Sequence, residues 1–254
     1  MGDIPESHPR RDSLLSRQKL VDAASKGMLA DSALIAHGRG EAFDYLLGEK
    51  TCKSARLAIT ETACRLRNSE KCIISVNGNT VALAGPQLIA CAAVLNCPIE
   101  VNIYYRTPKR MEVLLSTLMD QKQLASELYP QIGEKIAGVK ILGGKPDGRI
   151  PNLEGPRAIC HSEGILSADT ILVPLEDGDR CEALIAMGKT VCVIDLNPLS
   201  RTSQMATVTI VDELTRCVPI LLETLMDELN DFSNWNNKDN LENVIQEMLR
   251  NFNE

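Results

Sequence analysis

The chain has 254 residues, of which 44% are hydrophobic and 24% are charged, a balance typical of a globular protein with a large core. Its net charge of −7 and its aromatic content of 3% argue against a nucleic-acid partner, because such binding needs clustered cations or stacking rings. No apolar run approaches the roughly 20 residues of a membrane span, and residues 1–11 contain no apolar signal core, so we expect a soluble, cytoplasmic protein without a membrane partner.

The first third of the chain is predicted to be helical, because apolar residues recur there at helical spacing. We expect helical segments at residues 13–26, 29–36, 41–47 and 51–67. The sequence His37-Gly38-Arg39-Gly40 separates the second segment from the third, since a glycine inside a helix costs about 1 kcal/mol relative to alanine. Thr51 is the expected N-cap of the fourth segment.

From residue 71 onwards, short apolar segments alternate with helical ones. The predicted strands are residues 72–76, 99–104, 139–142, 170–174, 190–196 and 207–211. The predicted helices are residues 81–95, 109–120, 121–136, 180–187, 213–229 (capped by Asp212) and 241–252. The segment 143–163 is rich in glycine and proline and is predicted to be a loop. Apolar strands that alternate with helices are typical of a parallel sheet with right-handed crossovers.

The sequence therefore predicts an α/β fold with a mostly parallel sheet flanked by helices and preceded by a helical N-terminal region. We expect residues 1–70 to pack on the core or to reach a partner subunit, and residues 71–230 to form that core, which binds a nucleotide. Residues 231–254 are predicted to be a polar linker followed by a C-terminal amphipathic helix.

The most informative segment is 170–202, where polar side chains follow two predicted strands. An acidic loop with Glu176, Asp177 and Asp179 follows the first strand, and Asp195 closes the second strand. Open α/β sheets bind ligands just outside the carboxyl ends of their strands, and an acidic side chain there can accept hydrogen bonds from ribose hydroxyls. The segment indicates a nucleotide site, although G-x-G-x-x-G and the Walker A loop are both absent. The alternative is an acidic, solvated turn.

Two glycine-containing motifs are further candidates. The glycines around Arg39 favour a turn that brings this cation close to a ligand; the alternative is a helix C-cap followed by a surface arginine. The turn Asn77-Gly78-Asn79-Thr80 joins a strand to a helix, so its backbone N–H groups can bind an anion and its amides a carboxylate or hydroxyl. An Asx-rich turn without a ligand is the alternative there.

Two cationic segments are weaker candidates. Tyr104-Tyr105-Arg106 ends a predicted strand, where it forms either a binding group or an ordinary rim. The basic arm around residues 5–11, with Arg17 in the helix that follows, either reaches over a site in its own or a neighbouring subunit or is simply solvated.

The nine cysteines form no C-x-x-C pair, and the chain has only three histidines, so zinc-ligand spacing is absent. An odd number of cysteines in a chain of this type favours reduced, buried thiols that pack as small hydrophobic side chains. Cys181 is the exception, because it lies in the predicted nucleotide loop.

Five segments closely resemble the archaeal 4-phosphopantoate–β-alanine ligase family, also called phosphopantothenate synthetases. They are IPESHPR (4–10), LIAHGRGEAFDYLLGE (34–49), ISVNGN (74–79), VPLEDGDR (173–180) and IDLNPLSRT (194–202). The resemblance implies a Rossmann-like, homodimeric enzyme of coenzyme A biosynthesis. Such an enzyme joins 4-phosphopantoate to β-alanine, uses ATP and releases AMP and pyrophosphate.

The resemblance and the strand-end positions together give a set of expected ATP contacts. They are Arg17, Arg39, Asp179, Arg180, Cys181, Asp195, Asn197, Pro198, Leu199, Ser200 and Arg201. Cys181 departs from the hydroxyl residue expected in relatives, which weakens a side-chain contact but spares a backbone one. Segment 143–163 also departs from the family pattern, which leaves its role open.

The expected reaction activates the carboxylate of 4-phosphopantoate as an acyl-adenylate, which the amine of β-alanine then attacks. The two phosphorylated substrates carry roughly six negative charges. We expect Mg²⁺ and five arginines to gather around them, namely Arg17, Arg39, Arg106, Arg180 and Arg201. Asn77 and Asn79, with Arg106, would orient the acid, and Arg39 and His37 would be catalytic, His37 as a proton relay. The sequence assigns no metal ligands. The alternatives are a nicotinamide-dependent oxidoreductase and a nucleotide-binding regulatory protein.

Overall fold

The computed structural model describes residues 4–227 and 234–253. At its centre lies a six-stranded parallel sheet with the order β3-β2-β1-β6-β7-β8. These strands are β1 (Cys72–Val76), β2 (Ile99–Val101), β3 (Ile141–Leu142), β6 (Thr170–Pro174), β7 (Thr190–Ile194) and β8 (Val208–Ile210). This finding confirms the predicted α/β fold, and the strand order is that of a doubly wound Rossmann sheet.

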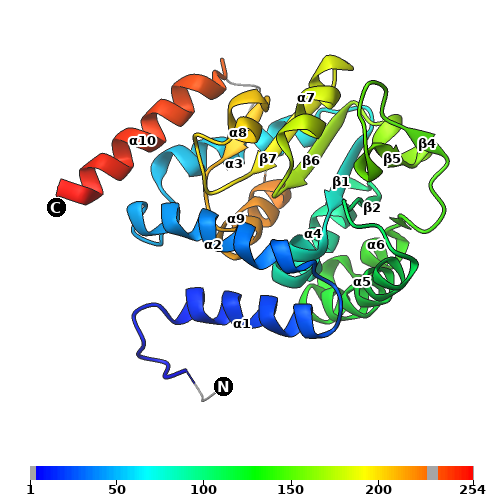
Figure 1. The fold of residues 1–254 in the computed structure, drawn as a ribbon, viewed down its shortest axis with the longest axis horizontal. Coiled ribbons are helices and arrows are strands. Elements are labelled where there is room, and N and C mark those ends of the chain that lie inside the picture. Colours follow the sequence, from blue (N-terminus) through cyan, green and yellow to red (C-terminus); the bar gives the residue numbers. More distant parts are fainter. Residues whose placement is uncertain (1–3, 228–233, 254) are drawn as a thin grey trace.

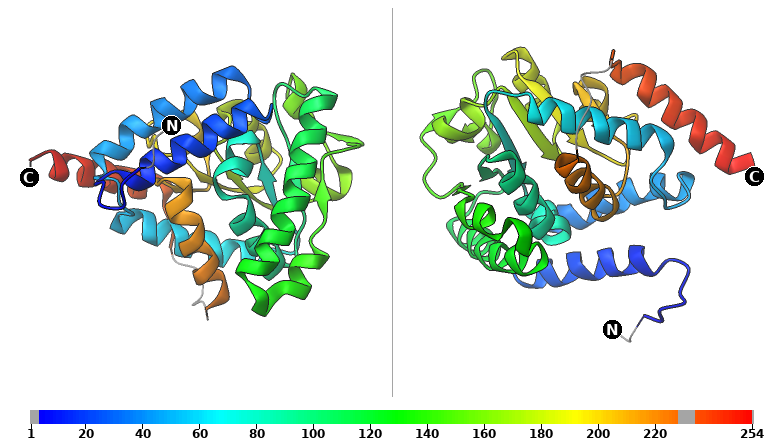
Figure 2. Two further views of the ribbon diagram at one scale, coloured as in Figure 1. Left: turned by 90° about the horizontal axis from the view of Figure 1, so that it is seen from below. Right: turned by 180° about the vertical axis from the view of Figure 1, so that it is seen from behind.

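Helices cover both faces of the sheet (Figures 1 and 2). The α-helices are α1 (Arg11–Ser25), α2 (Asp31–Leu46), α3 (Lys53–Arg67), α4 (Gly78–Leu95), α5 (Pro108–Leu128), α6 (Gly133–Gly138), α7 (Gly178–Ala186), α8 (Arg201–Met205), α9 (Leu214–Met226) and α10 (Asn237–Asn253). The short helical turns are η1 (Pro130–Ile132), η2 (Pro156–Ala158) and η3 (Ser162–Leu166). A separate antiparallel pair joins β4 (Gly148–Arg149) to β5 (Ile159–Cys160).

Alternate strand residues feed two hydrophobic cores, because successive side chains of a strand point to opposite faces. Ile74 and Leu172 pack into the core under α3, α4 and α9, whereas Ile73 and Ile171 pack into the core under α7 and η3. Helix α4 is long and apolar enough to cross a membrane, but 72% of it is buried inside the protein. Burial of that extent is typical of a core helix in a soluble protein.

The predicted break at residues 37–40 is wrong. Helix α2 runs without interruption through Gly38 and Gly40. A Cβ added at Gly40 would lie 3.6 Å from the Cβ of Leu196, so this glycine allows α2 to approach the loop after β7 closely. Tertiary packing of the helix outweighs a propensity cost of about 1 kcal/mol per glycine. As Figure 1 shows, α2 crosses the molecule beside the tips of the strand arrows.

Several predicted boundaries also differ. Cys52 rather than Thr51 caps α3, because its sulfur accepts from Ala55 N, while Thr51 donates to Asp212 over 2.6 Å. Glu213 rather than Asp212 caps α9, and the expected end of that helix at residue 229 lies outside the described residues. The predicted linker residues 237–240 belong to α10.

Candidate functional site

Polar residues from helices α2, α4 and α8 and from the loops after β6 and β7 line a cavity at the carboxyl ends of β1, β6 and β7. This space, which we call the α2 cavity, has a volume of about 650 Å³ and lies under helix α2. Predicted site residues that line it are His37, Arg39, Asn79, Asp195, Asn197 and Ser200. The cavity includes the carboxyl ends of β1 and β6, between which the strand order reverses, and open α/β sheets bind ligands at such a point.

Asp195 organises the loop after β7. Its Oδ1 accepts from Asn197 N over 2.9 Å and its Oδ2 accepts from Ser200 Oγ over 2.6 Å. Asn197 in turn accepts from Leu199 N over 2.9 Å. Burial raises the pKa of Asp195, while the hydrogen bond from Ser200 partly offsets that rise. The carboxylate therefore fixes the loop that forms one wall of the α2 cavity.

Helix α2 contributes a free cation and a neutral imidazole to the same cavity. Arg39 is exposed, and no carboxylate in the described part of the chain forms an ion pair with it. Burial lowers the pKa of His37 below its ordinary value, so the imidazole is neutral at pH 7. Arg17 lies near this histidine, but its Nε donates to Glu41 Oε1 over 2.7 Å and it does not line the α2 cavity.

A second space adjoins the first. This tyrosine cavity has a volume of about 510 Å³, and its walls include Tyr104, Tyr105, Arg157, Arg180 and Arg201. Asp177 lines both cavities, so the loop between β6 and α7 separates two spaces that meet at one carboxylate. Two adjoining cavities at one edge of the sheet suit an enzyme that brings two substrates together.

A buried ion-pair network supports that loop. The carboxylate of Glu176 accepts from Arg157 Nη1 over 2.5 Å and from Arg180 Nη1 over 2.7 Å. Arg180 also donates to Ser75 Oγ over 2.8 Å, and burial lowers its pKa. The Nε atom of Arg157 lies 3.0 Å from Asp177 Oδ2, but it is not aligned for a hydrogen bond and has no other partner. Arg157 therefore retains a buried donor on the tyrosine cavity.

The five arginines predicted to converge do not surround one cavity. Arg180 is only 1% exposed and ties β6 to β1 beneath the site, because its partners Glu176 and Ser75 are themselves buried. Arg201 lines the tyrosine cavity and is paired with Asp179 and Glu182.

Arg106 donates to the carbonyl of Gly143 and lines neither cavity. Arg17 is held by Glu41 and does not line the α2 cavity. Of the five arginines predicted from the sequence, Arg39 is therefore the one that lines this cavity.

Other predicted residues have structural roles. Asn77 caps α4 by accepting from Thr80 N over 3.1 Å, and its amide donates to Leu175 O over 2.9 Å. The amide of Asn79 donates to Ala33 O over 3.2 Å, which joins α4 to α2. The buried Cys181 thiol points to Thr202 O at 3.9 Å, and burial raises its pKa to about 12.

The remaining residues of this region differ in exposure. Leu199 is exposed and Pro198 is buried, and both lie outside the two cavity walls.

Sequence reasoning offered Tyr104 and Tyr105 as candidates, and both line the tyrosine cavity, but it missed Arg157. Arg157 lies in η2, inside the glycine- and proline-rich segment that was predicted to be a loop, and nothing local there signals burial. Its hydrogen bond with Glu176 and the hydrogen bond from Asn102 to its carbonyl both come from residues outside this segment. The one available signal was a lone arginine between Pro156 and an apolar pair.

Whether the two cavities can hold a metal ion depends on the donor atoms that their residues supply. The described residues contain no group of three or more histidine, cysteine or carboxylate side chains that could hold one. Mg²⁺ often binds through one or two carboxylates together with substrate phosphates, and Asp177 is a 58% exposed carboxylate at the junction of the cavities. The residues present therefore fit Mg²⁺ that arrives with a nucleotide.

Comparison with known proteins identifies the family of this chain. The sequence matches the family described as phosphopantothenate/pantothenate synthetase over residues 54–252. It is 46% identical over 233 residues to a 4-phosphopantoate–β-alanine ligase of Thermococcus kodakarensis, with 92% of this chain and 84% of that protein covered. A ligase of the same name from Methanosarcina mazei is 44% identical over 219 residues, with 86% of this chain and 80% of that protein covered. The chain therefore belongs to the phosphopantothenate/pantothenate synthetase family.

Proposed function

We propose that this protein is an ATP-dependent ligase of coenzyme A biosynthesis. It condenses 4-phosphopantoate with β-alanine to 4′-phosphopantothenate and releases AMP and pyrophosphate. The observation that carries the proposal is the pair of cavities that meet at Asp177, one with a free Arg39 and the other with Arg157. The names of relatives that align with most of the chain support the same reaction.

ATP is assigned to the α2 cavity. Its volume of about 650 Å³ falls within the usual range for small-molecule sites. Phe43, Leu175 and Leu196 supply apolar walls for the base. The Asp195–Ser200 loop offers oxygen atoms to the ribose, and Arg39 is placed to bind phosphate oxygens, which a guanidinium does with two parallel hydrogen bonds.

The phosphorylated acid is assigned to the tyrosine cavity, next to the nucleotide. Arg157 and Arg201 supply positive charge there, and these two replace Arg106 as the proposed phosphate ligands. Asn79 lines the neighbouring α2 cavity and is retained as a group that orients the reacting carboxylate. The shared wall at Asp177 would bring that carboxylate and the α-phosphate together.

The chemistry asks these residues mainly for positioning and charge neutralisation. The carboxylate of 4-phosphopantoate attacks the α-phosphorus, and pyrophosphate leaves as Arg39 stabilises its charge. The amine of β-alanine then attacks the acyl carbon, and AMP departs. His37, kept neutral by burial, accepts the proton that the amine loses. Mg²⁺ bound to the phosphates would neutralise part of their charge, with Asp177 as its protein ligand.

The products separate this proposal from its rivals. Purified protein with ATP, 4-phosphopantoate and β-alanine should form AMP, pyrophosphate and 4′-phosphopantothenate in equal amounts. Formation of ADP and phosphate would instead indicate an acyl-phosphate intermediate in place of the acyl-adenylate. A regulatory nucleotide-binding protein would give no turnover, and a nicotinamide-dependent oxidoreductase would instead consume NADH. We also propose that the protein is a cytoplasmic homodimer, which sedimentation of the purified chain and fractionation of its native cells would test.

A further inference from the structure

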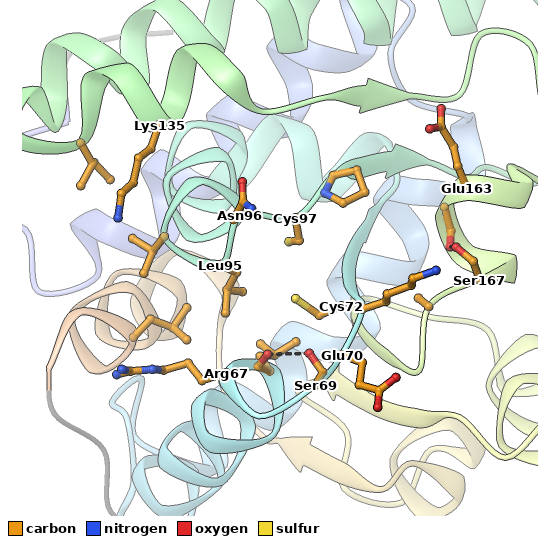
Figure 3. Close-up of a pocket in the computed structure, with 18 of the residues that line it drawn as sticks. Arg67, Ser69, Glu70, Cys72, Leu95, Asn96, Cys97, Lys135, Glu163 and Ser167 are labelled. Carbon is orange, nitrogen blue, oxygen red and sulfur yellow. Dashed lines mark hydrogen bonds between the residues drawn. The ribbon is translucent and has the colours of Figure 1, made fainter.

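Two cysteines lie side by side at the opposite edge of the sheet from the candidate site. A cavity of about 590 Å³ opens there, at the amino ends of β1, β2 and β6, and we call it the amino-edge cavity. Its walls include Ser69, Cys72, Asn96, Cys97 and Ser167. Figure 3 shows that Cys72 and Cys97 both project into this space from neighbouring segments. The proposed ligase reaction uses neither thiol.

The strand register brings these two cysteines together. Ile74 pairs with Ile99 across the parallel strands, so the residues two positions earlier in each segment, Cys72 and Cys97, are also neighbours. The backbone bond from Ile74 N to Pro98 O, over 3.2 Å, holds the two segments together next to the cysteines. Neighbouring strands lie about 4.8 Å apart, which falls inside the Cα separation that a disulfide accepts. Each thiol also influences the pKa of the other, as expected for side chains in close proximity.

The two thiols differ in their surroundings, and thiol–disulfide exchange depends on such a difference. All nine cysteines lie within the described residues, and Cys72 alone among them is not buried. Interaction with Cys97 lowers the pKa of Cys72, whereas interaction with Cys72 and burial raise the pKa of Cys97. A thiolate reacts with disulfides and a thiol does not, so Cys72 is the group that attacks first.

We propose that Cys72 and Cys97 form a redox-active pair that low-molecular-weight disulfides oxidise to an intramolecular disulfide. The Cys72 thiolate attacks one sulfur of the reagent RS–SR, and one RS⁻ leaves. Cys97 then loses its proton and attacks Cys72 Sγ of the mixed disulfide, which releases the second RS⁻. In total, two protein thiols are oxidised by two electrons, and one reagent disulfide is reduced to two thiols.

A single tryptic peptide reads out the result. Lys71 and Arg106 flank residues 72–106, which contain no other lysine or arginine and hold Cys72, Cys91 and Cys97. The folded protein is treated with cystamine, freed of reagent, denatured, alkylated with iodoacetamide and digested. We expect one alkyl group on this peptide, located on Cys91. The mass should be two hydrogen atoms below that of the same singly alkylated peptide with Cys72 and Cys97 as free thiols. Protein treated with dithiothreitol before alkylation should carry an alkyl group on all three cysteines.

Two variants test the assignment without relying on catalysis. Cys97→Ser should stop the reaction at a cysteamine adduct on Cys72. Cys91→Ser is the matched control, since Cys91 is fully buried and burial raises its pKa to about 12, and its oxidation should match the wild type. Full alkylation of wild-type protein after cystamine, a stable adduct on Cys72 in wild type, or a bridge that includes Cys91 would each overturn the proposal. Circular dichroism of each variant verifies that it is folded.

Discussion

Arg157 Nη1 donates to Glu176 Oε1 over 2.5 Å, and both residues are less than 10% exposed. This contact joins the glycine-rich segment after β3 to the loop after β6. The second oxygen of Glu176 accepts from Arg180, so one carboxylate neutralises two buried guanidinium groups. The loop that separates the two cavities is therefore held from below by an ion-pair network.

Glu176→Ala should destabilise the fold strongly, because it removes the ion-pair partner of the buried Arg180 and leaves Arg157 with only the exposed Asp177 as a counter-charge. Removing one partner of a buried ion pair typically costs about 3–5 kcal/mol. Urea unfolding followed by circular dichroism measures the change in the free energy of unfolding. Glu182→Ala is the matched control, since its ion pair with Arg201 is exposed and should contribute little. Equal stability of the two variants would contradict the role of the network.

Arg39→Ala should lower kcat/KM for ATP by about 100- to 1000-fold, as loss of a transition-state hydrogen-bond donor does. The fold should be unaffected, because Arg39 is exposed and has no ion-pair partner among the residues described. Steady-state kinetics at varied ATP measures the effect. Arg56→Ala, which removes another exposed arginine from a different helix, should retain wild-type kinetics. A wild-type kcat/KM in the Arg39 variant would remove this residue from the site.

Arg157→Lys should raise KM for 4-phosphopantoate at least tenfold while the KM for ATP changes little. The lysine keeps a charge that can pair with Glu176 but lacks the planar fork that binds two phosphate oxygens at once. Kinetics with each substrate varied in turn separates the two effects. Lys145→Ala, an exposed cation in the same segment, is the control. An equal rise of both KM values would instead indicate a general distortion of the loop.

The pH dependence of kcat/KM should report the protonation of His37. Its pKa is lowered in the folded protein, so the group is neutral and able to accept a proton above that value. The acid limb of the kcat/KM profile should therefore lie below pH 6.5, the ordinary histidine value, and His37→Gln should lose this limb. His8→Gln should keep it. An unchanged acid limb in the His37 variant would assign the titration to another group.

The same shift affects stability with a definite sign. The unfolded chain binds a proton at His37 more readily than the folded one, so the contribution of this group is complete above about pH 6.5 and is lost as the pH falls. Thermal unfolding of wild type between pH 5 and pH 7.5 should show a decline toward acid that the His37→Gln variant shows less steeply.

Strands β1 and β6 match their predicted residues in full, because each is a short, mostly apolar run that ends in a turn. The sheet order could not be predicted, since it depends on which strands meet in space. Helix α2 was divided in error because its glycines were weighed by helix propensity, whereas Gly40 allows close packing against Leu196.

The site was predicted unevenly for a related reason. Positions at the ends of strands, such as Asp195, follow from the strand pattern and do line the α2 cavity. The direction of a side chain does not follow from it. Arg180 in the first turn of α7 points into the core toward Ser75, and Arg157 reaches the loop after β6 from a segment without periodicity.

The most direct test of the account follows oxygen atoms through the reaction. The substrate is 4-phosphopantoate with ¹⁸O in its carboxylate, and the AMP product is analysed by mass spectrometry after one turnover with ATP and β-alanine. The acyl-adenylate mechanism predicts that AMP gains one ¹⁸O atom, because the carboxylate attacks the α-phosphorus and its oxygen stays with AMP when the amine displaces AMP. Unlabelled AMP, or label found in inorganic phosphate, would contradict it.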